Sequence, residues 1–464
     1  MTRIQPLDTR PDLLALHAMH PERYPYLLES AGSRHGRFDI LFAFPGESLV
    51  LHVNGRLETP IPPARGNDFL AALDEWWSAE RADPATAIAP FAGGWFVYLG
   101  YELAGQIETG LGLRPAGALP VAFATRIRAA LVHDRALQRS WSVTEDGNGT
   151  LAERMRRDAA TCPAAAEISA EGPTSVGHAS LDSSRIPRMR VEEEPPARFL
   201  EAVRRAKAYI EAGDIYQANL SRAWTAEPAP ADPAGVYRRL RETNPGPFAG
   251  LARWRDTAII SSSPERLLRI RGNVAESRPI AGTRPRNAEP EADRRLSEEL
   301  IAHPKERAEH IMLIDLVRND LGRVCRPGSI EVDELMAIES YAHVHHIVSN
   351  VRGVLEESAT PGRVMRAVFP GGTITGCPKV RCMQIIEELE GAPRGAYTGS
   401  MGYLNRDGSC DLNILIRTLV QSGRQIGLRS GAGIVADSDP ERELEECRAK
   451  ARGLLLALDG ADER

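Results

Sequence analysis

The chain has 464 residues, enough for about three domains of ~150 residues each, and its 57 Lys and Arg against 63 Asp and Glu leave a net charge of −6. This charge argues against nucleic acid as the main partner, because binding a phosphate backbone requires a basic surface. The 42% hydrophobic and 26% charged residues are those of an ordinary globular protein, and no apolar run reaches the ~18 residues that span a bilayer.

The beginning of the chain does not look like a secretion signal. The first twenty residues mix charged with apolar side chains, so they lack the apolar core of such a signal. Six cysteines are scattered without CxxC spacing, which suits reduced thiols better than disulfides or a zinc site. Together these features predict a cytoplasmic protein.

The first region, residues 1–160, is rich in short strand-like segments. Apolar runs over 38–44 and 48–53 predict strands, with Pro45-Gly46-Glu47 as the turn between them. Residues 161–194 are rich in Ala, Ser, Gly and Pro and have no sustained apolar period, which is typical of a linker or a long surface excursion. A second and larger region is expected over 195–458.

This second region mixes helices and strands. Pro195 and Pro196 open a predicted helix that Gly213 ends. Strands and helices do not alternate one for one, and the strand-like runs 399–404 and 412–420 are joined by a turn-forming Asn-Arg-Asp-Gly segment, so we predict an antiparallel α+β fold rather than a doubly wound parallel sheet. The other predicted elements are helices near 291–320, 361–368, 378–390 and 440–458, and strands over 257–261, 342–351 and 425–428.

The last predicted helix places two carboxylates and an ammonium group on one face. Glu443, Glu446 and Lys450 stand at i, i+3 and i+7, which in an isolated helix is most often a solvated face. The small residues 431–434 precede this helix. We expect them to form a loop whose amides approach an anion, which favours a functional interpretation of the acidic face.

Glu309 is a second acidic candidate, just after a helix restart at Pro304. One or two carboxylates with substrate oxygens suffice for Mg²⁺, so Glu309 and Glu446 are a chemically sufficient pair if the fold brings them together. His343, His345 and His346 fit a zinc site poorly, because in a strand His346 points away from the other two. One functional histidine is the better interpretation.

Residues 371–379 read Gly-Gly-Thr-Ile-Thr-Gly-Cys-Pro-Lys and superficially suggest a phosphate loop. They fail that pattern, because Gly376 is not followed directly by Lys and then Ser or Thr. The segment is either a carboxylate-binding turn or a tight connection. No GxSxG, HExxH or GxGxxG pattern occurs, which disfavours hydrolase, zinc protease and dinucleotide-binding functions.

Several ordered motifs resemble those of the chorismate-utilising enzymes, the family of anthranilate synthase component I, aminodeoxychorismate synthase component I, isochorismate synthases and salicylate synthases. The resemblance runs from about 195 to 455 and is weaker before that. The motifs are Ser263-Pro264-Glu265, 278–286, 305–310, Arg318-Asn319-Asp320, 346–349, 371–381, Ile416-Arg417-Thr418 and 431–434.

This resemblance implies antiparallel β-sheets packed face to face with helices outside. It also implies Mg²⁺ as the cofactor, held by Glu309 and Glu446 against the ring carboxylate of chorismate, with Glu443 helping through water. Glu265 matches a general acid or base near C4, and His346 a second residue that handles or orients a proton.

The same resemblance assigns residues to the anionic groups of the substrate. Arg417 and Tyr397 would hold the enolpyruvyl carboxylate, since the planar guanidinium suits a bidentate anion. Lys450 would bind the ring carboxylate together with the amides around Gly431 and Gly433. The remaining residues implied to line the site are Gly282, Thr283 and Thr373.

Two positions bear on the branch of the family. Isochorismate and salicylate synthases resemble one another in having a water-activating lysine where this chain has Gln217, and an amide cannot act as a general base. Ammonia is therefore the expected nucleophile. Ala281 stands where many aminodeoxychorismate synthases carry a nucleophilic lysine, and alanine is usual there in anthranilate synthases.

Other motifs favour the aminodeoxychorismate-forming branch, among them 216–221, Pro247-Phe248, 373–379 and 399–404. We predict amination of chorismate at C4 to 4-amino-4-deoxychorismate, for 4-aminobenzoate and folate synthesis, through a noncovalent intermediate aminated at C2. The alternative is anthranilate formation for tryptophan synthesis. A remote alternative is a catalytically silent binding protein on the same fold.

Two further expectations concern partners. Leu28, Glu29 and Ser30 resemble the tryptophan-pocket motif of feedback-regulated anthranilate synthases, although in the other branch a similar pocket can be structural. Nothing in the sequence resembles a glutaminase. The resemblance therefore implies a separate glutamine amidotransferase subunit that supplies ammonia.

Overall fold

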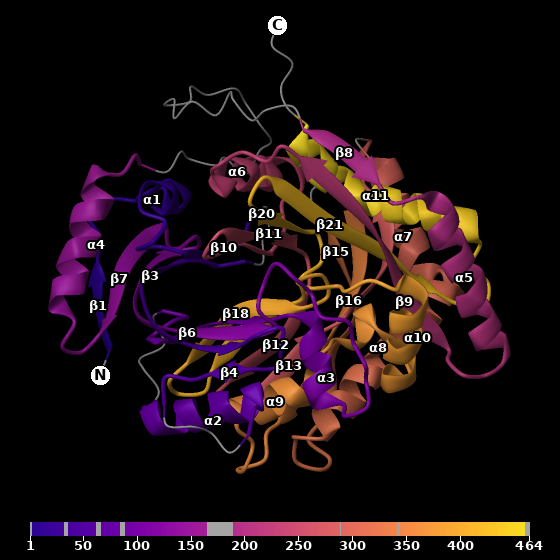
Figure 1. Ribbon diagram of the computed structural model, residues 1–464, viewed down its shortest axis with the longest axis horizontal. Helices are drawn as coiled ribbons and strands as arrows, with labels where there is room; N and C mark the ends of the chain where they lie inside the picture. Colours follow the sequence, from indigo (N-terminus) through magenta and orange to yellow (C-terminus); the bar gives the residue numbers. More distant parts are fainter. Residues whose placement is uncertain are drawn as a thin grey trace, which may run out of the picture.

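The computed structural model describes residues 2–31, 36–61, 66–83, 89–164, 189–287, 289–340 and 344–459. The strands of these residues belong to one connected sheet system in which each pairing is antiparallel (Figure 1). The predicted α+β class is confirmed. The strands are β1 (Thr2–Pro6), β2 (Tyr26–Glu29), β3 (Phe38–Leu51), β4 (Leu57–Glu58), β5 (Gly94–Leu99), β6 (Ala122–Asp134), β7 (Arg139–Glu145), β8 (Arg190–Glu193), β9 (Gln217–Glu227), β10 (Phe248–Trp254), β11 (Thr257–Ser263), β12 (Arg266–Arg271), β13 (Val274–Arg278), β14 (Ile280–Pro285), β15 (Glu331–Ser340), β16 (Val344–Val354), β17 (Gly376–Cys377), β18 (Ser400–Asn405), β19 (Cys410–Asn413), β20 (Thr418–Ser422) and β21 (Gln425–Ile434).

Most of the helices begin where the sequence offers a capping side chain or a proline. Pro196 opens one predicted helix, and Asp439 caps the last one through a bond from the amide of Arg442, with Pro440 in its first turn. The helices are α1 (Leu13–Met19), α2 (Phe69–Glu80), α3 (Ala104–Ile107), α4 (Gly149–Thr161), α5 (Pro196–Glu211), α6 (Pro233–Thr243), α7 (Pro290–Ala302), α8 (Pro304–Gly322), α9 (Pro361–Val368), α10 (Lys379–Glu390) and α11 (Pro440–Leu458), with 3₁₀ turns η1 (Tyr101–Leu103) and η2 (Gly372–Ile374).

The three largest clusters of buried apolar side chains stack across the molecule. The middle cluster is built mainly by strands, including Phe42, Phe96 and Phe123. One flanking cluster adds α1, α5, α6, α10 and α11, and the other adds α2, α8 and α9. Figure 1 accordingly places α6 and α11 along one side and α2 and α9 along the other. The helix–sheet–sheet–helix order agrees with the sandwich that the resemblance implied.

The long strand β3 runs through both halves of this sandwich. Leu41 packs in the cluster with α1 and α5, whereas Leu49 and Leu51 pack in the cluster with α2. The predicted turn at 45–47 is wrong, because pairing with β6 continues through it and only a register irregularity separates Pro45 from Ser48. A proline is tolerated at such a bulge, since no ladder hydrogen bond is needed there.

Two predictions about the C-terminal strands need correction. The predicted strand 412–420 is divided into β19 and β20, which pair with different neighbours: β19 with β18 and β12, and β20 with β11 and β21. The predicted loop 431–434 is the end of strand β21, paired with β9. Tertiary pairing decides both cases. The local sequence does not distinguish one strand from two over 412–420, nor a loop from a strand end over 431–434.

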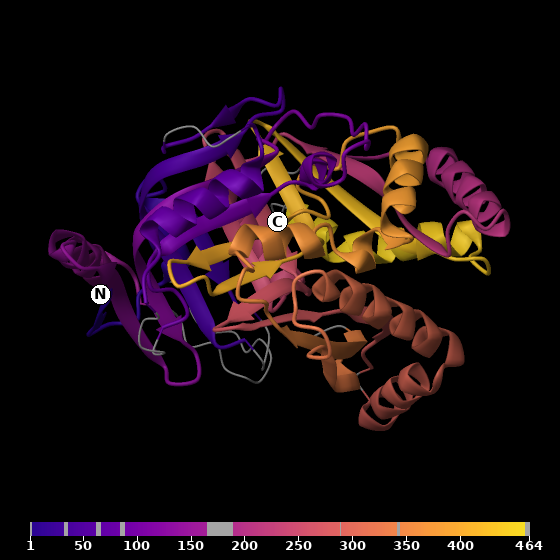
Figure 2. The ribbon, with the colours of Figure 1, turned by 90° about the horizontal axis from the view of Figure 1, so that it is seen from below.

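The two sequence regions share their sheets. Strand β2 pairs with β10, and β5 pairs with β18. Within the predicted linker 161–194, residues 190–193 form β8 against β9, while 165–188 lie outside the described residues. Figure 2 shows the helices of 290–322 beside the strands of 331–354, at one end of the molecule. No helix in the described part of the chain is long and apolar enough to cross a membrane.

Candidate active site

Glu265 lies in the connection from β11 to β12, where its main chain is held from both sides. Its amide donates to Ser263 Oγ at 3.2 Å, and its carbonyl accepts from the amide of Ile414 at 3.0 Å. The residue is 4% exposed, and Thr373 Oγ1 donates to its Oε1 at 2.8 Å. Burial raises the pKa of this carboxyl to about 7, against smaller opposing effects of Thr373 and the main chain of Ile280. Glu265 can therefore both give and take a proton near neutral pH.

His346 lies on β16 and faces the irregular part of β14. A register shift between Ala281 and Thr283 accommodates Gly282, whose φ is 62°. The imidazole Nδ1 lies 3.0 Å from the carbonyl oxygen of Gly282 and 3.1 Å from Thr283 Oγ1. Burial lowers the pKa of His346 to about 4, so the ring is neutral at pH 7 and acts through hydrogen bonds rather than through charge.

The neighbouring histidine has different partners. His345 Nδ1 lies 2.7 Å from Ser340 Oγ, and its Nε2 lies 2.9 Å from Asp293 Oδ1. His345 and His346 thus contact different segments on either side of β16, as their places in a strand predicted. His343 lies outside the described residues.

Arg417 lies where the predicted strand breaks, between β19 and β20, with a φ of 53° that is strained for a residue other than glycine. Its Nη1 donates to the carbonyl of Lys450, and Lys450 Nζ in turn donates to the carbonyl of Gly431 at 3.1 Å. Lys450 also pairs with Glu446 at 2.6 Å. The positive charges of Arg417 and Lys450 contribute to lowering the pKa of His346, so these cations and the histidine share one site.

Two glycines of β21 make room for polar side chains from β9 and for Tyr397. A Cβ at Gly433 would lie 2.4 Å from Gln217 Nε2, and one at Gly431 would lie 2.7 Å from the Tyr397 hydroxyl and 2.9 Å from Asn219 Oδ1. Gln217 Oε1 and Asn219 Oδ1 are buried without a hydrogen-bond partner in the described part of the chain. Both oxygens are acceptors available to a ligand that carries N–H or O–H groups.

The three predicted metal-binding carboxylates come from two helices and lie within electrostatic reach of one another. Burial raises the pKa of Glu309, on α8, to about 6, and the negative charges of Glu306, Glu443 and Glu446 add to this while Lys305 opposes it. Burial also raises the pKa of Glu443, and Glu446 acts in the same direction. The fold therefore concentrates negative charge where α8 meets α11.

This carboxylate group fits Mg²⁺ by its chemistry. Among the described residues, no group of three or more His, Cys, Asp and Glu side chains is close enough to be a ready-formed metal site. The donors are nevertheless hard oxygens, and side-chain exposures of 30% for Glu309 and 51% for Glu446 leave room for water and substrate oxygens in the shell. A cation would also offset the like charges that raise the pKa of Glu309.

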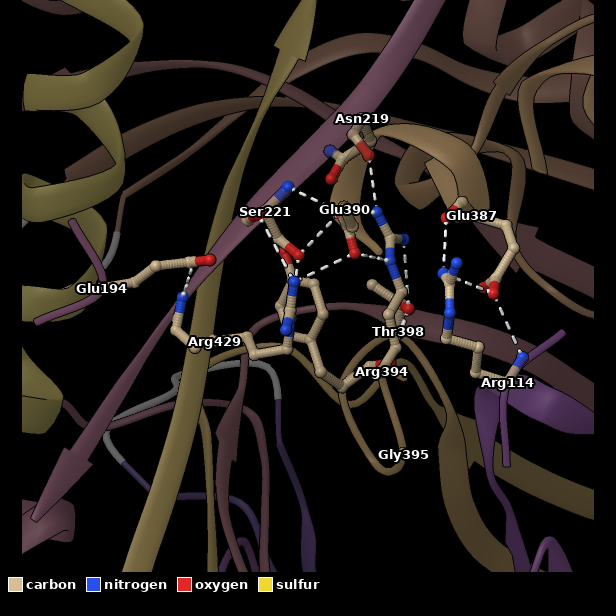
Figure 3. Close-up of polar contacts among 12 residues, drawn as sticks. Arg114, Glu194, Asn219, Ser221, Glu387, Glu390, Arg394, Gly395, Thr398 and Arg429 are labelled. Carbon is tan, nitrogen blue, oxygen red and sulfur yellow. Dashed lines mark hydrogen bonds and ion pairs between the residues drawn. The ribbon is translucent and has the colours of Figure 1, made fainter. Parts of the chain in front are cut away.

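Three residues of the region were not predicted. Asn219 could have been found, because it follows Gln217 by two positions in a strand and so shares its face. Glu390 and Arg394 lie behind the site in a buried polar network (Figure 3), and no chemical motif in the sequence marks them.

Leu28, Glu29 and Ser30 line a cavity of about 660 Å³, whose lining also includes Pro264 and Ile280 but not Glu265 or His346. The carboxylate of Glu29 is buried and accepts hydrogen bonds from the Tyr237 hydroxyl at 2.8 Å and from Arg241 Nη1 at 3.0 Å. The protein therefore already compensates the charge of Glu29. A ligand would be selected by the shape of the cavity and by the other polar groups that line it.

Comparison with known proteins agrees with this architecture. Residues 24–456 match the family described as chorismate binding enzyme, and the chain belongs to that family. It is 45% identical over 383 residues to a protein of Synechocystis sp. named anthranilate synthase component I-like protein, covering 80% of this chain and 74% of that one. It is 49% identical over 265 residues to aminodeoxychorismate synthase component 1 of Bacillus subtilis, covering 57% of this chain and 56% of that one.

Among solved structures, anthranilate synthase component I of Streptococcus pneumoniae superposes with a TM-score of 0.77 at 29% identity, covering 91% of this chain and 93% of that one. Relatives of similar identity thus carry the names of both amination branches. The comparisons establish the family and the fold.

Proposed function

We propose that this chain aminates chorismate at C4, with ammonia as the nucleophile, to form 4-amino-4-deoxychorismate. The observation that favours amination over water addition is Gln217, a buried amide packed against Gly433. An amide cannot act as a general base, so no side chain at this position could activate water. The motif resemblance of 216–221 and 373–379 favours the C4 product. This is the product that 4-aminobenzoate and folate synthesis consume.

The site residues support a two-step substitution. Ammonia attacks C2, the ring double bonds shift, and the C4 hydroxyl leaves as water with a proton from Glu265. A second ammonia then attacks C4, the double bonds shift back, and the amine at C2 leaves as ammonia. Glu265, with a pKa of about 7, is suited to give the first proton and to recover one from the ammonium formed later. The methyl group of Ala281 offers no nucleophile for a covalent alternative.

The anionic groups of the substrate would contact the open side of the site. Arg417 and Tyr397 would bind the enolpyruvyl carboxylate, and Lys450 the ring carboxylate. Glu309, Glu443 and Glu446 would hold Mg²⁺, which when bound supplies orientation and charge neutralisation for the ring carboxylate. Neutral His346 would orient a substrate hydroxyl or ammonia through a hydrogen bond rather than through charge.

Ammonia is proposed to come from a separate glutamine amidotransferase subunit, since no glutaminase motif occurs in this sequence. A mixture with such a subunit should use glutamine, whereas the chain alone should depend on ammonium. If the isolated chain releases glutamate from glutamine, the proposed division of labour is wrong.

Anthranilate formation is the second candidate. Ala281 favours it, and so does the name of the Synechocystis relative, which is similar over a larger part of its own length than the Bacillus protein is. In that reaction the amine would remain at C2 and the enolpyruvyl group would leave as pyruvate. The two candidates differ only after C2 has been aminated.

Product analysis decides between them. The full chain is incubated with chorismate, Mg²⁺ and ammonium at mildly alkaline pH, with and without an aminodeoxychorismate lyase, and the products are separated by liquid chromatography and identified by mass spectrometry. The proposal requires 4-aminobenzoate only when the lyase is present. Anthranilate and pyruvate without the lyase would establish the second candidate instead.

The noncovalent pathway has its own test. Intact-protein mass spectrometry during turnover should show only the unmodified mass, because Ala281 cannot add to C2. A chorismate-derived adduct on any lysine would contradict this part of the proposal.

We also propose that the cavity lined by Leu28, Glu29 and Ser30 binds tryptophan. Saturating tryptophan should then raise the melting temperature of the wild-type chain, whereas phenylalanine at the same concentration should not. Equal melting temperatures with and without tryptophan would make the pocket purely structural.

A further inference from the structure

A single buried carboxylate joins the segments that surround the candidate site. Glu390, the last residue of α10, accepts hydrogen bonds from the amide of Ser221 at 2.8 Å and from Ser221 Oγ at 2.9 Å (Figure 3). It also accepts from Arg394 Nη2 at 2.6 Å, Arg394 Nε at 3.0 Å and Arg429 Nη2 at 3.0 Å. The side chains of Glu390 and Arg394 are only 2% and 1% exposed, so these bonds form away from solvent.

Arg394 connects this network to two main-chain carbonyls and to one side-chain hydroxyl. It donates to the carbonyl of Asn219 at 2.6 Å and to the carbonyl of Ile374 at 3.1 Å, and its Nη1 lies 3.4 Å from Thr398 Oγ1. Its guanidinium also lies 5.6 Å from the ring centroid of Tyr397. One side chain therefore contacts β9, the turn η2 and the segment that precedes β18.

The residues that Arg394 contacts are sequence neighbours of residues assigned to the site. Ile374 follows Thr373, whose hydroxyl donates to Glu265. Thr398 follows Tyr397 and has a φ of 62°, so its conformation needs support from its surroundings. The amide of Asn219 also donates to the carbonyl of Thr375 at 2.8 Å, which closes a ring of contacts around Arg394.

We propose that Arg394, held by Glu390, is a positioning residue that fixes the spacing between the proton-transfer group Glu265 and the carboxylate-binding Tyr397. It acts through the main chain of Ile374 on one side and through Thr398 on the other. The inference rests on the proposed chorismate site and holds for either amination product, because both need Glu265 and Tyr397 on the same substrate. A displacement of about 1 Å between such groups is enough to cost about 100-fold in rate.

The chain contains a matched control for a purely structural ion pair. Arg126 on β6 is 1% exposed and pairs with Glu80 at 2.7 Å and Glu145 at 2.7 Å. Among the described residues, its other side-chain hydrogen bonds go only to the main-chain carbonyls of 94 and 127. It touches none of the residues assigned to the site. Arg126→Lys should therefore show how much stability and activity are lost when a buried, ion-paired arginine outside the site is replaced.

The test compares Arg394→Lys with Arg126→Lys in the full-length chain, using ammonium as the nitrogen source. Melting temperature and the kcat and KM for chorismate consumption are measured for both. We expect both variants to lose melting temperature, but only Arg394→Lys to lose kcat, by more than tenfold, with a smaller change in KM. If kcat falls equally in both, or in proportion to the loss of melting temperature, Arg394 is structural and the proposal is wrong.

A double-mutant cycle checks the route of the effect. Thr373→Val removes the hydroxyl that bonds Glu265, and its cost in kcat should be smaller in the Arg394→Lys background than in the wild type, because the contact is already misplaced there. Independent, multiplicative losses would overturn the route through Ile374.

Two further measurements keep the result interpretable. Should Arg394→Lys not fold, Glu390→Gln removes the charge that holds Arg394 with less change in volume, and the same loss of kcat is expected from it. Wild-type consumption of chorismate is measured first. Its absence would refute the proposed function, whereas consumption that is insensitive to both variants would refute only the positioning role.

Discussion

The two sides of the candidate site differ in how they treat charge. On the closed side, Glu265 and His346 are 4% and 7% exposed, and hydrogen bonds from Thr373 and to Gly282 hold them in place. On the open side, the side chain of Glu446 is 51% exposed and three carboxylates lie in reach of one another. The closed side is organised by the protein alone and tuned by burial, whereas the open side keeps an excess of negative charge that a cation can satisfy.

The largest expected effect comes from the closed side. Glu265→Gln keeps the shape and the bond from Thr373 but removes the transferable proton, so kcat should fall by about 10²- to 10⁴-fold. Steady-state kinetics of chorismate consumption measure this loss. A variant with more than a tenth of wild-type kcat would show that Glu265 is not the proton-transfer group.

The same substitution has a predicted signature in stability. The folded pKa of Glu265 is raised to about 7, so the native state keeps a proton that the unfolded chain loses, and wild-type stability is lost as the pH rises from about 4.5 to 7. Glu265→Gln lacks this loss. Its free energy of unfolding relative to wild type should therefore improve by roughly 3 kcal/mol between pH 4 and pH 8, as measured by urea unfolding at both pH values.

The next effect probes the open side. Glu309→Gln should raise the Mg²⁺ concentration needed for half-maximal activity by about 10- to 100-fold, since a charged donor is lost from the site. Without Mg²⁺ the variant should be no less stable than wild type, because burial and the neighbouring negative charges already disfavour the ionised form of Glu309 and raise its pKa. Metal titrations of activity and melting curves measured in a chelator test both points. An unchanged Mg²⁺ requirement would remove Glu309 from the metal site.

A smaller effect is expected from alanine substitutions on β21, which compare a clash with the main chain and a clash with a movable side chain. A Cβ at Gly431 would lie 2.5 Å from the carbonyl oxygen of Leu220, which cannot move easily, so Gly431→Ala should cost about 1–3 kcal/mol of stability as well as activity. Gly433→Ala meets mainly the movable amide of Gln217 and should raise the KM for chorismate with less loss of stability. Gly427→Ala on the same strand has open space and is the control. Equal stability losses in all three would indicate a general strand effect.

The smallest effect is a difference in pH dependence between the two sides. The pKa of Glu309 is raised to about 6, so below pH 6 protonation should weaken Mg²⁺ binding, and saturating metal should restore part of the activity. His346, with a pKa lowered to about 4, should not contribute to any change between pH 6 and 8. Activity at pH 5.5 that does not respond to added Mg²⁺ would place the limiting titration elsewhere.

Local patterns were sufficient to predict several parts of this molecule. The helix predicted over 440–458 is α11, which spans Pro440–Leu458. The opposite orientations of His345 and His346 follow from the period of a strand. The acidic residues of α8 and α11 were recognised by motif, and the fold brings their charges together.

Other features could not be predicted locally. The run 412–420 has the local pattern of one strand, but its two halves pair with different strands. Arg417, with its positive φ, lies at the break between them. Glu390 and Arg394 look like surface charges on the end of a helix and in a loop. They are buried because β9, β21, η2 and the segment before β18 pack around them.

The sequence by itself determined the family, the antiparallel α+β class and the chemistry available, because spacing and residue type are properties of the chain alone. The tertiary structure decided which of these groups are buried away from water, which are charged and which are in contact. Desolvation and hydrogen bonding depend on neighbours that can be more than 100 positions away in the sequence, such as Thr373 for Glu265, at 108 positions, and Asn219 for Arg394, at 175. That is why the raised pKa of Glu265 and the network around Arg394 appear only after folding.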